Sequence, residues 1–348
     1  TLVKSSAASD VYKRQTFHSI KKLSLEIKKY VNKGDRCLLI SENRPEWFIT
    51  DLSVMLSEAI TVPAYTTYAE KDYEYIIENC NPKLIFVSNQ EQFNKVKEII
   101  KKKSFVTKIF SFEQLDIDSE SYINVNKLFS NLDYQDLKIP DLSIKRNDPA
   151  CIIYTSGTQG NPKGVILSHG GILNNCDGAL DILKPLLTDQ TRFLTWLPLS
   201  HSYEHTVQFV QISVGAKIFY AESIEKLIKN MNDCKPQLMT AVPRFYQNLF
   251  QKINASFNKV TGLKKKLILK MLQLGTKKIN KQSLTILEKL IDNILEKIVR
   301  KKIKSQFGGE LKTFVSGGGA LDKEVGIFLN AIGPVSYTHL TLPTTSPV

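Results

Sequence analysis

The stretch from residue 36 to residue 110 constrains the fold most, because apolar runs of strand length alternate along it with helical patterns. The apolar runs occupy residues 36–41, 59–62, 83–88 and 105–110. Apolar residues at the three- and four-residue spacing of half-buried helices occupy residues 19–31, 45–56, 72–79 and 92–101. Parallel strands need long crossovers, which are usually helical. This alternation therefore predicts an α/β fold with a largely parallel sheet covered by helices.

The composition narrows the class of protein. The 348 residues can bury a sizeable core, and 42% hydrophobic with 23% charged residues is an ordinary globular composition, enough for one large or two medium domains. No apolar run reaches about 18 residues, the length needed for a spanning helix, and the N-terminus has no apolar signal core. The five cysteines form no Cys-x-x-Cys pair, which argues against a zinc site or a disulfide framework and favours a reducing, cytoplasmic location.

A glycine-rich loop follows the next apolar run. Residues 154–165 read Tyr-Thr-Ser-Gly-Thr-Gln-Gly-Asn-Pro-Lys-Gly-Val. Glycines let backbone N–H groups approach anionic oxygens, hydroxyls add rotatable donors, and a lysine supplies a compact charge. The spacing is not that of a Walker A loop. A polar turn between strands is the alternative. The candidate phosphate-binding residues are Thr155, Ser156, Gly157, Thr158, Gly160 and Lys163.

The elements around and after this loop follow from local signals. Strands are expected over residues 150–155 and 164–167, and Ser168 is expected to cap a helix that runs to about Leu183. Pro243 is expected to open a helix, because proline is favoured at a first helical position. Further strands are predicted over residues 191–196, 237–242 and 311–315, and further helices over residues 223–234 and 322–333.

Two later blocks carry residues suited to chemistry. Residues 197–205 read Leu-Pro-Leu-Ser-His-Ser-Tyr-Glu-His, and their spacing would place His201, Glu204 and His205 on one helical face. No supporting ligand lies nearby in the sequence, so we expect no metal site within this chain. Residues 316–321 read Ser-Gly-Gly-Gly-Ala-Leu, whose small side chains would let a flat ring stack on the backbone. A plain strand-to-helix turn is the alternative for this second block.

These blocks resemble the motifs of the adenylate-forming superfamily, which comprises the acyl-CoA synthetases, the luciferases and the peptide-synthetase adenylation domains. The loop at residues 154–165 is similar to the superfamily signature except at Gln159. Residues 197–205 resemble the Leu-Pro-Leu-(Ala/Ser)-His-x-x-Glu-Arg element of long-chain members, with His205 in place of arginine. Further similar blocks are found at residues 34–36, 42–47, 62–65 and 242–246. We expect a mainly structural role for the three blocks before residue 66, because none presents a nucleophile, a base or a metal cluster.

The resemblance implies an AMP-forming long-chain fatty acid:CoA ligase that uses ATP, Mg2+ and coenzyme A. It implies that the loop holds the β and γ phosphates and that His201 and Glu204 lie near the reaction centre. It further implies that Gly318, Gly319 and Ala320 form the adenine pocket. It also implies that Val242, Pro243 and Arg244 lie in the vicinity of the acyl group or nucleotide. An acyl-AMP or acyl-carrier-protein ligase shares the first half-reaction. A non-catalytic nucleotide-binding fragment is the alternative from another class.

The resemblance also implies a domain organisation. It covers about residues 16–333 and indicates a layered α/β/α/β/α N-terminal domain with two sheet-containing subdomains, residues 16–140 and 141–333, the second carrying the phosphate loop. Residues 1–15 and 334–348 do not follow the pattern, and we expect them to be non-native. The family's Tyr-Gly-x-Thr-Glu block, whose glutamate binds magnesium, does not follow residue 333. We therefore expect a domain incomplete at its C-terminal end and inactive alone.

The positive charge is concentrated in one segment. Residues 256–305 hold 14 of the Lys and Arg residues and three acidic ones, within a chain whose net charge is +13. Apolar residues recur there at helical spacing, with basic residues around them from Lys281 to Lys304. Such a helix can lie on an anionic membrane, and a packed helical pair with a solvated basic face is the alternative. Nucleic acid is disfavoured because no recognition fold or interleaved aromatics accompany the lysines. The sequence leaves a peripheral location on the inner face of a membrane, and a homodimer, as hypotheses.

Overall fold

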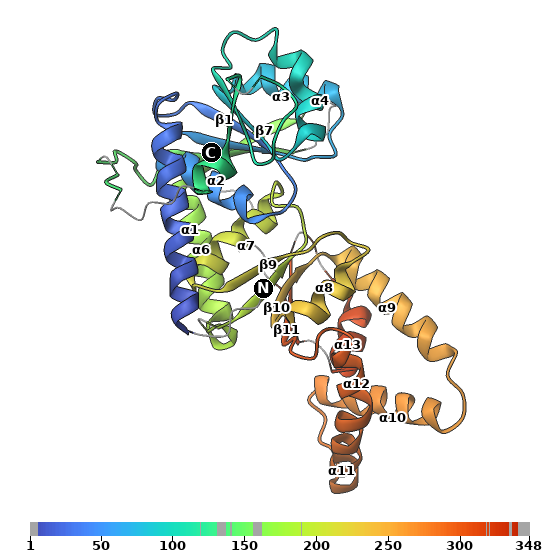
Figure 1. Ribbon diagram of the computed structural model, residues 1–348. Helices are drawn as coiled ribbons and strands as arrows, with labels where there is room; N and C mark the ends of the chain where they lie inside the picture. Colours follow the sequence, from blue (N-terminus) through green and yellow to red (C-terminus); the bar gives the residue numbers. More distant parts are fainter. Residues whose placement is uncertain are drawn as a thin grey trace. The chain divides into compact units, whose positions relative to one another are not determined.

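The computed structural model describes residues 6–118, 120–130, 137–139, 141–155, 162–188, 190–317, 319, 321–333 and 336–339. Contacts divide the chain into two compact units (Figure 1). The first unit comprises Thr1–Asn174 and Pro198–Ser202. The second comprises Asn175–Leu197 and Tyr203–Val348. Each unit is built on its own sheet.

The first unit contains a seven-stranded sheet in the order β5-β4-β3-β1-β2-β6-β7. All neighbours pair in parallel except β6 and β7, which form an antiparallel hairpin. The strands are β1 (Arg36–Ile40), β2 (Ile60–Ala64), β3 (Leu84–Val87), β4 (Lys108–Ser111), β5 (Tyr122–Asn124), β6 (Pro149–Thr155) and β7 (Lys163–Ser168). Strand β3 is buried along its whole length, as expected for a parallel strand covered on both faces.

The helices of the first unit begin where local capping signals lie. They are α1 (Ser6–Ile27), α2 (Pro45–Leu56), α3 (Glu70–Cys80), α4 (Gln90–Ile100), α5 (Val125–Ser130) and the start of α6 (His169–Leu183). Asn89 caps α4 by accepting a hydrogen bond from the Gln92 N–H at 3.1 Å. The predicted cap of α6 is confirmed, because the Ser168 hydroxyl accepts from the Gly171 N–H at 3.1 Å. Helix α1 begins at Ser6, before the predicted start at residue 19.

The second unit contains a five-stranded sheet in the order β12-β11-β10-β8-β9, all parallel. Its strands are β8 (Arg192–Thr195), β9 (Lys217–Tyr220), β10 (Leu238–Ala241), β11 (Thr313–Ser316) and β12 (Ser336–His339). Its helices are the rest of α6 and α7 (Ser202–Ser213, whose first residue belongs to the first unit), α8 (Leu227–Cys234), α9 (Pro243–Asn258), α10 (Gly262–Ile279), α11 (Ile286–Leu295), α12 (Lys301–Ser305) and α13 (Lys323–Ala331). Pro243 occupies the first position of α9, as predicted. The predicted α/β class with two sheets is thus confirmed.

The basic segment is tied to the second unit by a buried arginine. A π-helical turn, Glu296–Arg300, joins α11 to α12 and brings Arg300 into the interior. The Arg300 guanidinium donates to Asp292 Oδ1 at 2.8 Å, to the Ala331 carbonyl at 3.1 Å and to the Met271 carbonyl at 3.3 Å. These bonds join α11, α13 and α10. A buried arginine therefore links α10 and α11 of the basic segment, whose other basic residues are mostly exposed, to α13.

The first sheet continues beyond residue 140, where the first subdomain was expected to end, because it includes the β6–β7 hairpin. Strand β6 pairs with β2, so residues 149–168 extend the first sheet. Strand β12 pairs with β11, although it lies within residues 334–348, which we expected to be non-native. The domain limits and the nature of the two ends stay predictions. Among the described residues, no helix combines the length and apolar content needed to cross a bilayer.

Candidate functional site

The first group of candidate residues lies at the open end of the β6–β7 hairpin. Thr155 and Lys163 are the last cross-strand pair, and both are exposed. Directly opposed residues of an antiparallel pair have Cβ atoms about 5 Å apart on the same face of the sheet. The predicted residues Ser156, Gly157, Thr158 and Gly160 lie between them, outside the described residues. The hairpin therefore brings a hydroxyl and an ammonium group together at both ends of the glycine-rich loop.

A buried tyrosine supports this hairpin. The Tyr154 hydroxyl donates to Asn79 Oδ1 at 2.5 Å, which ties β6 to α3, and burial raises the pKa of Tyr154. Gly164 lies opposite Tyr154. A Cβ at Gly164 would lie 2.9 Å from Ile152 Cγ2 and 3.2 Å from Cζ of the Tyr154 ring. Only glycine fits there without displacing the ring. Asn79 was not predicted, because its contact with Tyr154 spans 75 residues.

The second group lies at the carboxyl edge of the second sheet. The chain passes from β8 to β9 on one side and then to β10 on the other side of β8. In open α/β sheets, ligands bind beyond the carboxyl ends of the strands where the strand order reverses in this way. Val242, Pro243 and Arg244 follow β10 directly, with Arg244 exposed in the first turn of α9. The predicted residues of this block therefore lie at a topological switch point.

Glycines after β11 allow close packing at the same edge. A Cβ at Gly317 would lie 2.2 Å from the ring of Tyr203, whose hydroxyl donates to the Val315 carbonyl at 2.8 Å. A Cβ at Gly319 would lie 3.5 Å from Pro243 Cγ, an ordinary contact. Two predicted groups, the glycine turn and the Val-Pro-Arg block, are thus neighbours. Gly318 and Ala320 lie outside the described residues.

Glu204 is fully buried beneath this edge. Its Oε2 accepts a hydrogen bond from the Thr240 hydroxyl at 2.6 Å, and within the described part of the chain Oε1 has no hydrogen-bond partner. Desolvation by burial raises the pKa of Glu204 to about 8, against the lowering effect of its hydrogen bonds. One turn later, both amide atoms of Gln208 are buried and lack partners among the described residues. Glu204 is therefore neutral near pH 7, which the sequence did not predict.

His201 lies just before the helix that carries Glu204. It precedes α7, in the segment Pro198–Ser202 of the first unit, and its N–H donates to the Pro198 carbonyl at 3.0 Å. Its side chain is exposed, and partial desolvation lowers its pKa. His205, in contrast, is buried on α7. The single-face arrangement expected from spacing stays a prediction, because His201 immediately precedes the first helical residue, Ser202.

The residues that the structure describes offer no cluster of metal ligands, and the cavity found in the second unit lies elsewhere. In the part of the chain that the structure describes, no three His, Cys, Asp or Glu side chains gather as metal ligands. A cavity of about 520 Å3 in the second unit is lined by Asp177, Leu180, Asp181, Lys184, Leu187, Thr188 and Val214. None of these is a predicted site residue. The chemistry of the residues, rather than this cavity, therefore indicates the site.

Comparison with solved structures identifies the fold. The N-terminal domain of FACL13 from Mycobacterium tuberculosis has a TM-score of 0.65 at 15% identity, covering 94% of this chain and 67% of that one. ATP-bound MatB from Rhodopseudomonas palustris has a TM-score of 0.65 at 16% identity, covering 94% of this chain and 54% of that one. At these identities the likeness shows a shared fold.

Sequence comparisons extend this result. Long chain acyl-CoA synthetase 3 of Arabidopsis thaliana is 29% identical over 316 residues, which are 87% of this chain and 46% of that protein. Fatty acyl-CoA synthetase A of Dictyostelium discoideum is 28% identical over 313 residues, 86% of this chain and 45% of that protein. The chain thus spans about half the length of these curated relatives. The AMP-binding enzyme family model matches residues 15–340, nearly the whole chain. The chain therefore belongs to the AMP-binding enzyme family.

Proposed function

We propose that this chain carries the ATP- and acyl-binding part of an AMP-forming long-chain fatty acid:CoA ligase. A fatty carboxylate oxygen attacks the α-phosphorus of ATP and pyrophosphate leaves, which forms an acyl-adenylate. The thiol of coenzyme A then attacks the acyl carbonyl, AMP leaves and a thioester forms. The observation that carries the proposal is the pairing of Thr155 with Lys163 at the open end of the β6–β7 hairpin.

The hairpin residues have a role in the first half-reaction. Negative charge builds on the phosphoryl oxygens and on the leaving pyrophosphate, and fixed donors stabilise it best when they are positioned beforehand. The Lys163 ammonium and the Thr155 hydroxyl bind the β and γ phosphates. Backbone N–H groups and hydroxyls of Ser156, Gly157, Thr158 and Gly160 complete this binding.

The edge of the second sheet binds the remaining parts of the substrates. The turn at Gly318, Gly319 and Ala320 presents backbone to the adenine ring, and Pro243 lies against Gly319. Because Glu204 is neutral near pH 7, it adds no repulsion against the phosphates. His201 lies near the carboxylate that is activated, and Val242 and Arg244 lie near the acyl group or nucleotide. These assignments follow the family resemblance, residue by residue.

Magnesium accompanies ATP in this family, and none of the described residues is assigned as its ligand. Mg2+ prefers charged carboxylates and water in an octahedral arrangement. Glu204, which lies beneath the edge, is buried and neutral near pH 7, and no cluster of ligands is found among the described residues. No step of the reaction is therefore assigned to the metal.

The basic segment is proposed to contact an anionic membrane from which fatty acids are drawn. Ile286, Leu287, Leu290, Ile294 and Ile298 are between 55% and 81% exposed and recur at three- and four-residue spacing. Exposed lysines, among them Lys289 and Lys297, accompany this stripe. Apolar burial and about 1 kcal/mol of attraction per basic residue near the surface support peripheral binding.

Vesicle sedimentation tests the membrane contact. The protein is expected to sediment with anionic vesicles, less with neutral ones, and less at high salt. Leu290→Gln with Ile294→Gln should reduce sedimentation, because both side chains belong to the exposed stripe. Leu173→Gln, at an exposed apolar residue of α6, is the control and should bind as the wild type does. Equal and negligible binding to both kinds of vesicle would end this part of the proposal.

Pyrophosphate exchange with palmitate and ATP tests the activity. The full-length protein is expected to catalyse palmitate-dependent exchange and to form palmitoyl-CoA when coenzyme A is added, whereas this chain alone is expected to show no exchange. Exchange without a CoA thioester would instead assign an acyl-AMP or acyl-carrier-protein ligase. Binding of ATP without exchange in the full-length protein would assign a non-catalytic nucleotide-binding protein.

Lys163→Ala directly tests the role of the Thr155–Lys163 pair in ATP binding. We expect ATP affinity to fall by about 10- to 100-fold, because a charge-assisted hydrogen bond contributes roughly 1.5–3 kcal/mol. Lys108→Ala is the matched control, since Lys108 begins β4 of the same sheet. Its ATP affinity should stay within about twofold of the wild type. Calorimetric titration measures both, and an unchanged affinity in Lys163→Ala would contradict the role of the hairpin.

A further inference from the structure

The segment Pro198–Ser202 belongs to the first unit, although the residues on both sides of it belong to the second. It carries His201, which the resemblance places near the reaction centre. Leu199 and Ser200 are buried, whereas His201 is exposed. The segment contains only the turn at Pro198 and the first residue of α7, so contacts with the rest of the first unit must hold it in place.

One side chain of the first unit bonds directly to this segment. The Leu199 N–H donates to Oδ1 of Asn43 at 2.9 Å, across 156 positions of the chain. Asn43 lies between β1 and α2, at the carboxyl edge of the first sheet. The bonded amide is two residues from His201. A hydrogen bond this close limits the positions that the His201 backbone can take.

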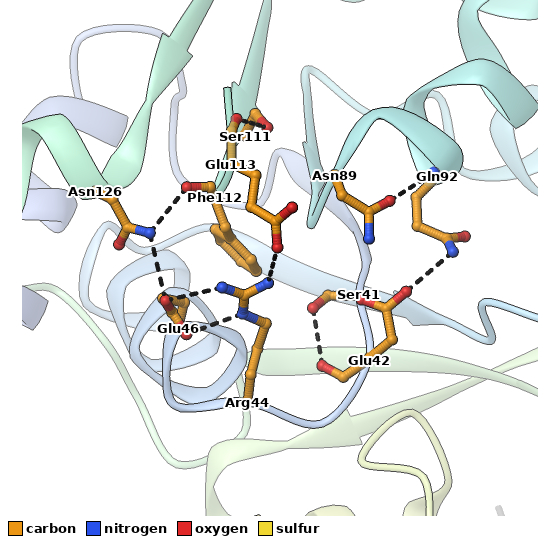
Figure 2. Close-up of polar contacts among 10 residues, drawn as sticks. All are labelled: Ser41, Glu42, Arg44, Glu46, Asn89, Gln92, Ser111, Phe112, Glu113 and Asn126. Atoms are coloured by element: carbon orange, nitrogen blue, oxygen red, sulfur yellow. Dashed lines mark hydrogen bonds and ion pairs between the residues drawn. The ribbon is translucent and has the colours of Figure 1, made fainter. Parts of the chain in front are cut away.

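The neighbours of Asn43 are fixed by a polar network (Figure 2). Arg44 donates to Glu46 at 3.0 and 3.1 Å and to Glu113 at 2.8 Å, with its guanidinium 5.5 Å from the centre of the Phe112 ring. On the other side, Glu42 Oε1 accepts from Gln92 Nε2 at 3.0 Å. Residues 42 and 44 are therefore both bonded to other elements. The bonds of residues 42 and 44 hold the backbone of Asn43 in place independently of its bond to Leu199.

We infer that Asn43 is a positioning residue, which acts through Leu199 to hold the segment carrying His201 on the first unit. Residues 42–47 were expected to have a mainly structural role, and nothing in their sequence indicates a partner near residue 199. Asparagine suits the position because its amide oxygen accepts from a backbone N–H without adding charge. The effect on catalysis rests on the proposed function, whereas the contact itself does not.

Amide hydrogen exchange tests the contact without any assay of activity. In Asn43→Ala and Asn43→Leu, we expect the Leu199 amide to exchange at least about tenfold faster, because its acceptor is lost. Asn43→Asp keeps an acceptor oxygen and should retain most of the protection. Ser168→Ala is the control: the Ser168 hydroxyl also accepts from a backbone N–H, at 3.1 Å, at the start of α6 in the first unit, and none of its described bonds joins the network around Asn43. It should leave the Leu199 amide unchanged.

The His201 ring provides a second measurement. Its NMR signals, assigned by their loss in His201→Ala, should shift in Asn43→Ala and stay in place in Ser168→Ala. Unchanged Leu199 exchange in Asn43→Ala would overturn the inference. So would equal changes in Asn43→Ala and Ser168→Ala, because these would report a general loss of stability.

Kinetics then separate the inference from the proposed function. If the wild type catalyses pyrophosphate exchange, Asn43→Ala should lower kcat by about tenfold with KM for ATP within about twofold, since misplacement near the reacting atoms mainly slows chemistry. Asn43→Asp should restore part of kcat. An unchanged kcat would overturn the positioning role. If the full-length wild type shows no exchange, the proposed function fails, and the hydrogen-exchange and NMR results still decide whether Asn43 holds the segment.

Discussion

The carboxyl edges of the two sheets differ in how they are filled, although both lie at a reversal of strand order. In the first sheet the order reverses between β1 and β3, and charged side chains occupy this edge in mutual pairs around Arg44. In the second sheet it reverses between β8 and β10, and the edge carries glycines, Pro243 and the neutral Glu204. A switch point alone does not make a binding site. The first edge is closed by ion pairs, whereas the second carries small and neutral groups together with the exposed Arg244.

The largest expected effect tests the neutrality of Glu204. Its pKa in the folded protein is about 8, above its ordinary value of 4.5, so the folded state keeps a proton that the unfolded state loses. Stability is therefore lost as pH rises from about 4.5 to about 8. Glu204→Gln should remove this loss and stabilise the protein near pH 8 by on the order of 3 kcal/mol. Denaturant unfolding measured from pH 5 to pH 8 checks it.

The control for this prediction is Glu113→Gln, because Glu113 is a largely exposed carboxylate of the first edge. The slope of its stability with pH should resemble that of the wild type. If Glu204→Gln had the same slope as the wild type between pH 5 and pH 8, Glu204 would be charged, and the contrast between the two edges would fail.

The next effect concerns close packing at the second edge. In Gly317→Ala the new methyl group would overlap the ring of Tyr203, which is buried and hydrogen-bonded. We expect a loss of about 1–3 kcal/mol in the free energy of unfolding, typical of overpacking. Thermal and denaturant unfolding measure it. A stability equal to that of the wild type would show that Tyr203 moves freely and that the edge is not tightly packed.

Breaking the ion pairs of the first edge should have a somewhat smaller effect. Although desolvation raises the pKa of Glu46, the hydrogen bonds from Arg44 hold it below its ordinary value. Arg44→Met leaves Glu46 partly buried without this partner and should cost about 1–2 kcal/mol of stability. ATP affinity, measured by calorimetry, should be unchanged. A clear fall in ATP affinity would mean that the first edge also binds nucleotide.

The smallest expected effect is a fall in ATP affinity without a change in the free energy of unfolding. A Cβ at Gly319 meets only an ordinary contact with Pro243, so Gly319→Ala should leave stability within about 0.5 kcal/mol of the wild type. The added methyl group would separate the adenine ring from the backbone. ATP affinity should therefore fall a few-fold, corresponding to roughly 1 kcal/mol. Unchanged affinity, measured alongside Gly317→Ala, would remove Gly319 from the adenine pocket.

Local signals predicted much of the fold. The helical pattern over residues 45–56 gave α2 with its observed bounds, and Ser168 and Pro243 marked the starts of α6 and α9. Each of these depends on residues within a few positions, because capping and proline geometry act over one turn. Membership of the family was likewise predicted from contiguous motifs and is confirmed.

Contacts between distant residues could not be predicted in this way. The bond between Asn43 and Leu199 and the packing of Tyr203 on Gly317 depend on the finished fold. The spacing of apolar residues in the basic segment did not distinguish buried positions from exposed ones. In the structure Leu295 is buried, whereas Leu287 is exposed. Periodicity identifies an amphipathic helix but not how wide a stripe its neighbours cover. The proposed roles of the candidate site residues stay predictions.

The five-residue segment Pro198–Ser202 has a consequence for the order of synthesis. The chain leaves the ribosome from its N-terminus, and domains generally fold as units in that order. Because Leu199 supplies a bond of the first unit, that unit is complete only after residues 175–197, including β8, have been made. Strand β8 lies between β10 and β9 of the second sheet and is made before either. A chain ended at residue 174 would therefore lack the bond to Asn43, so the first unit cannot complete its contacts before part of the second has been made.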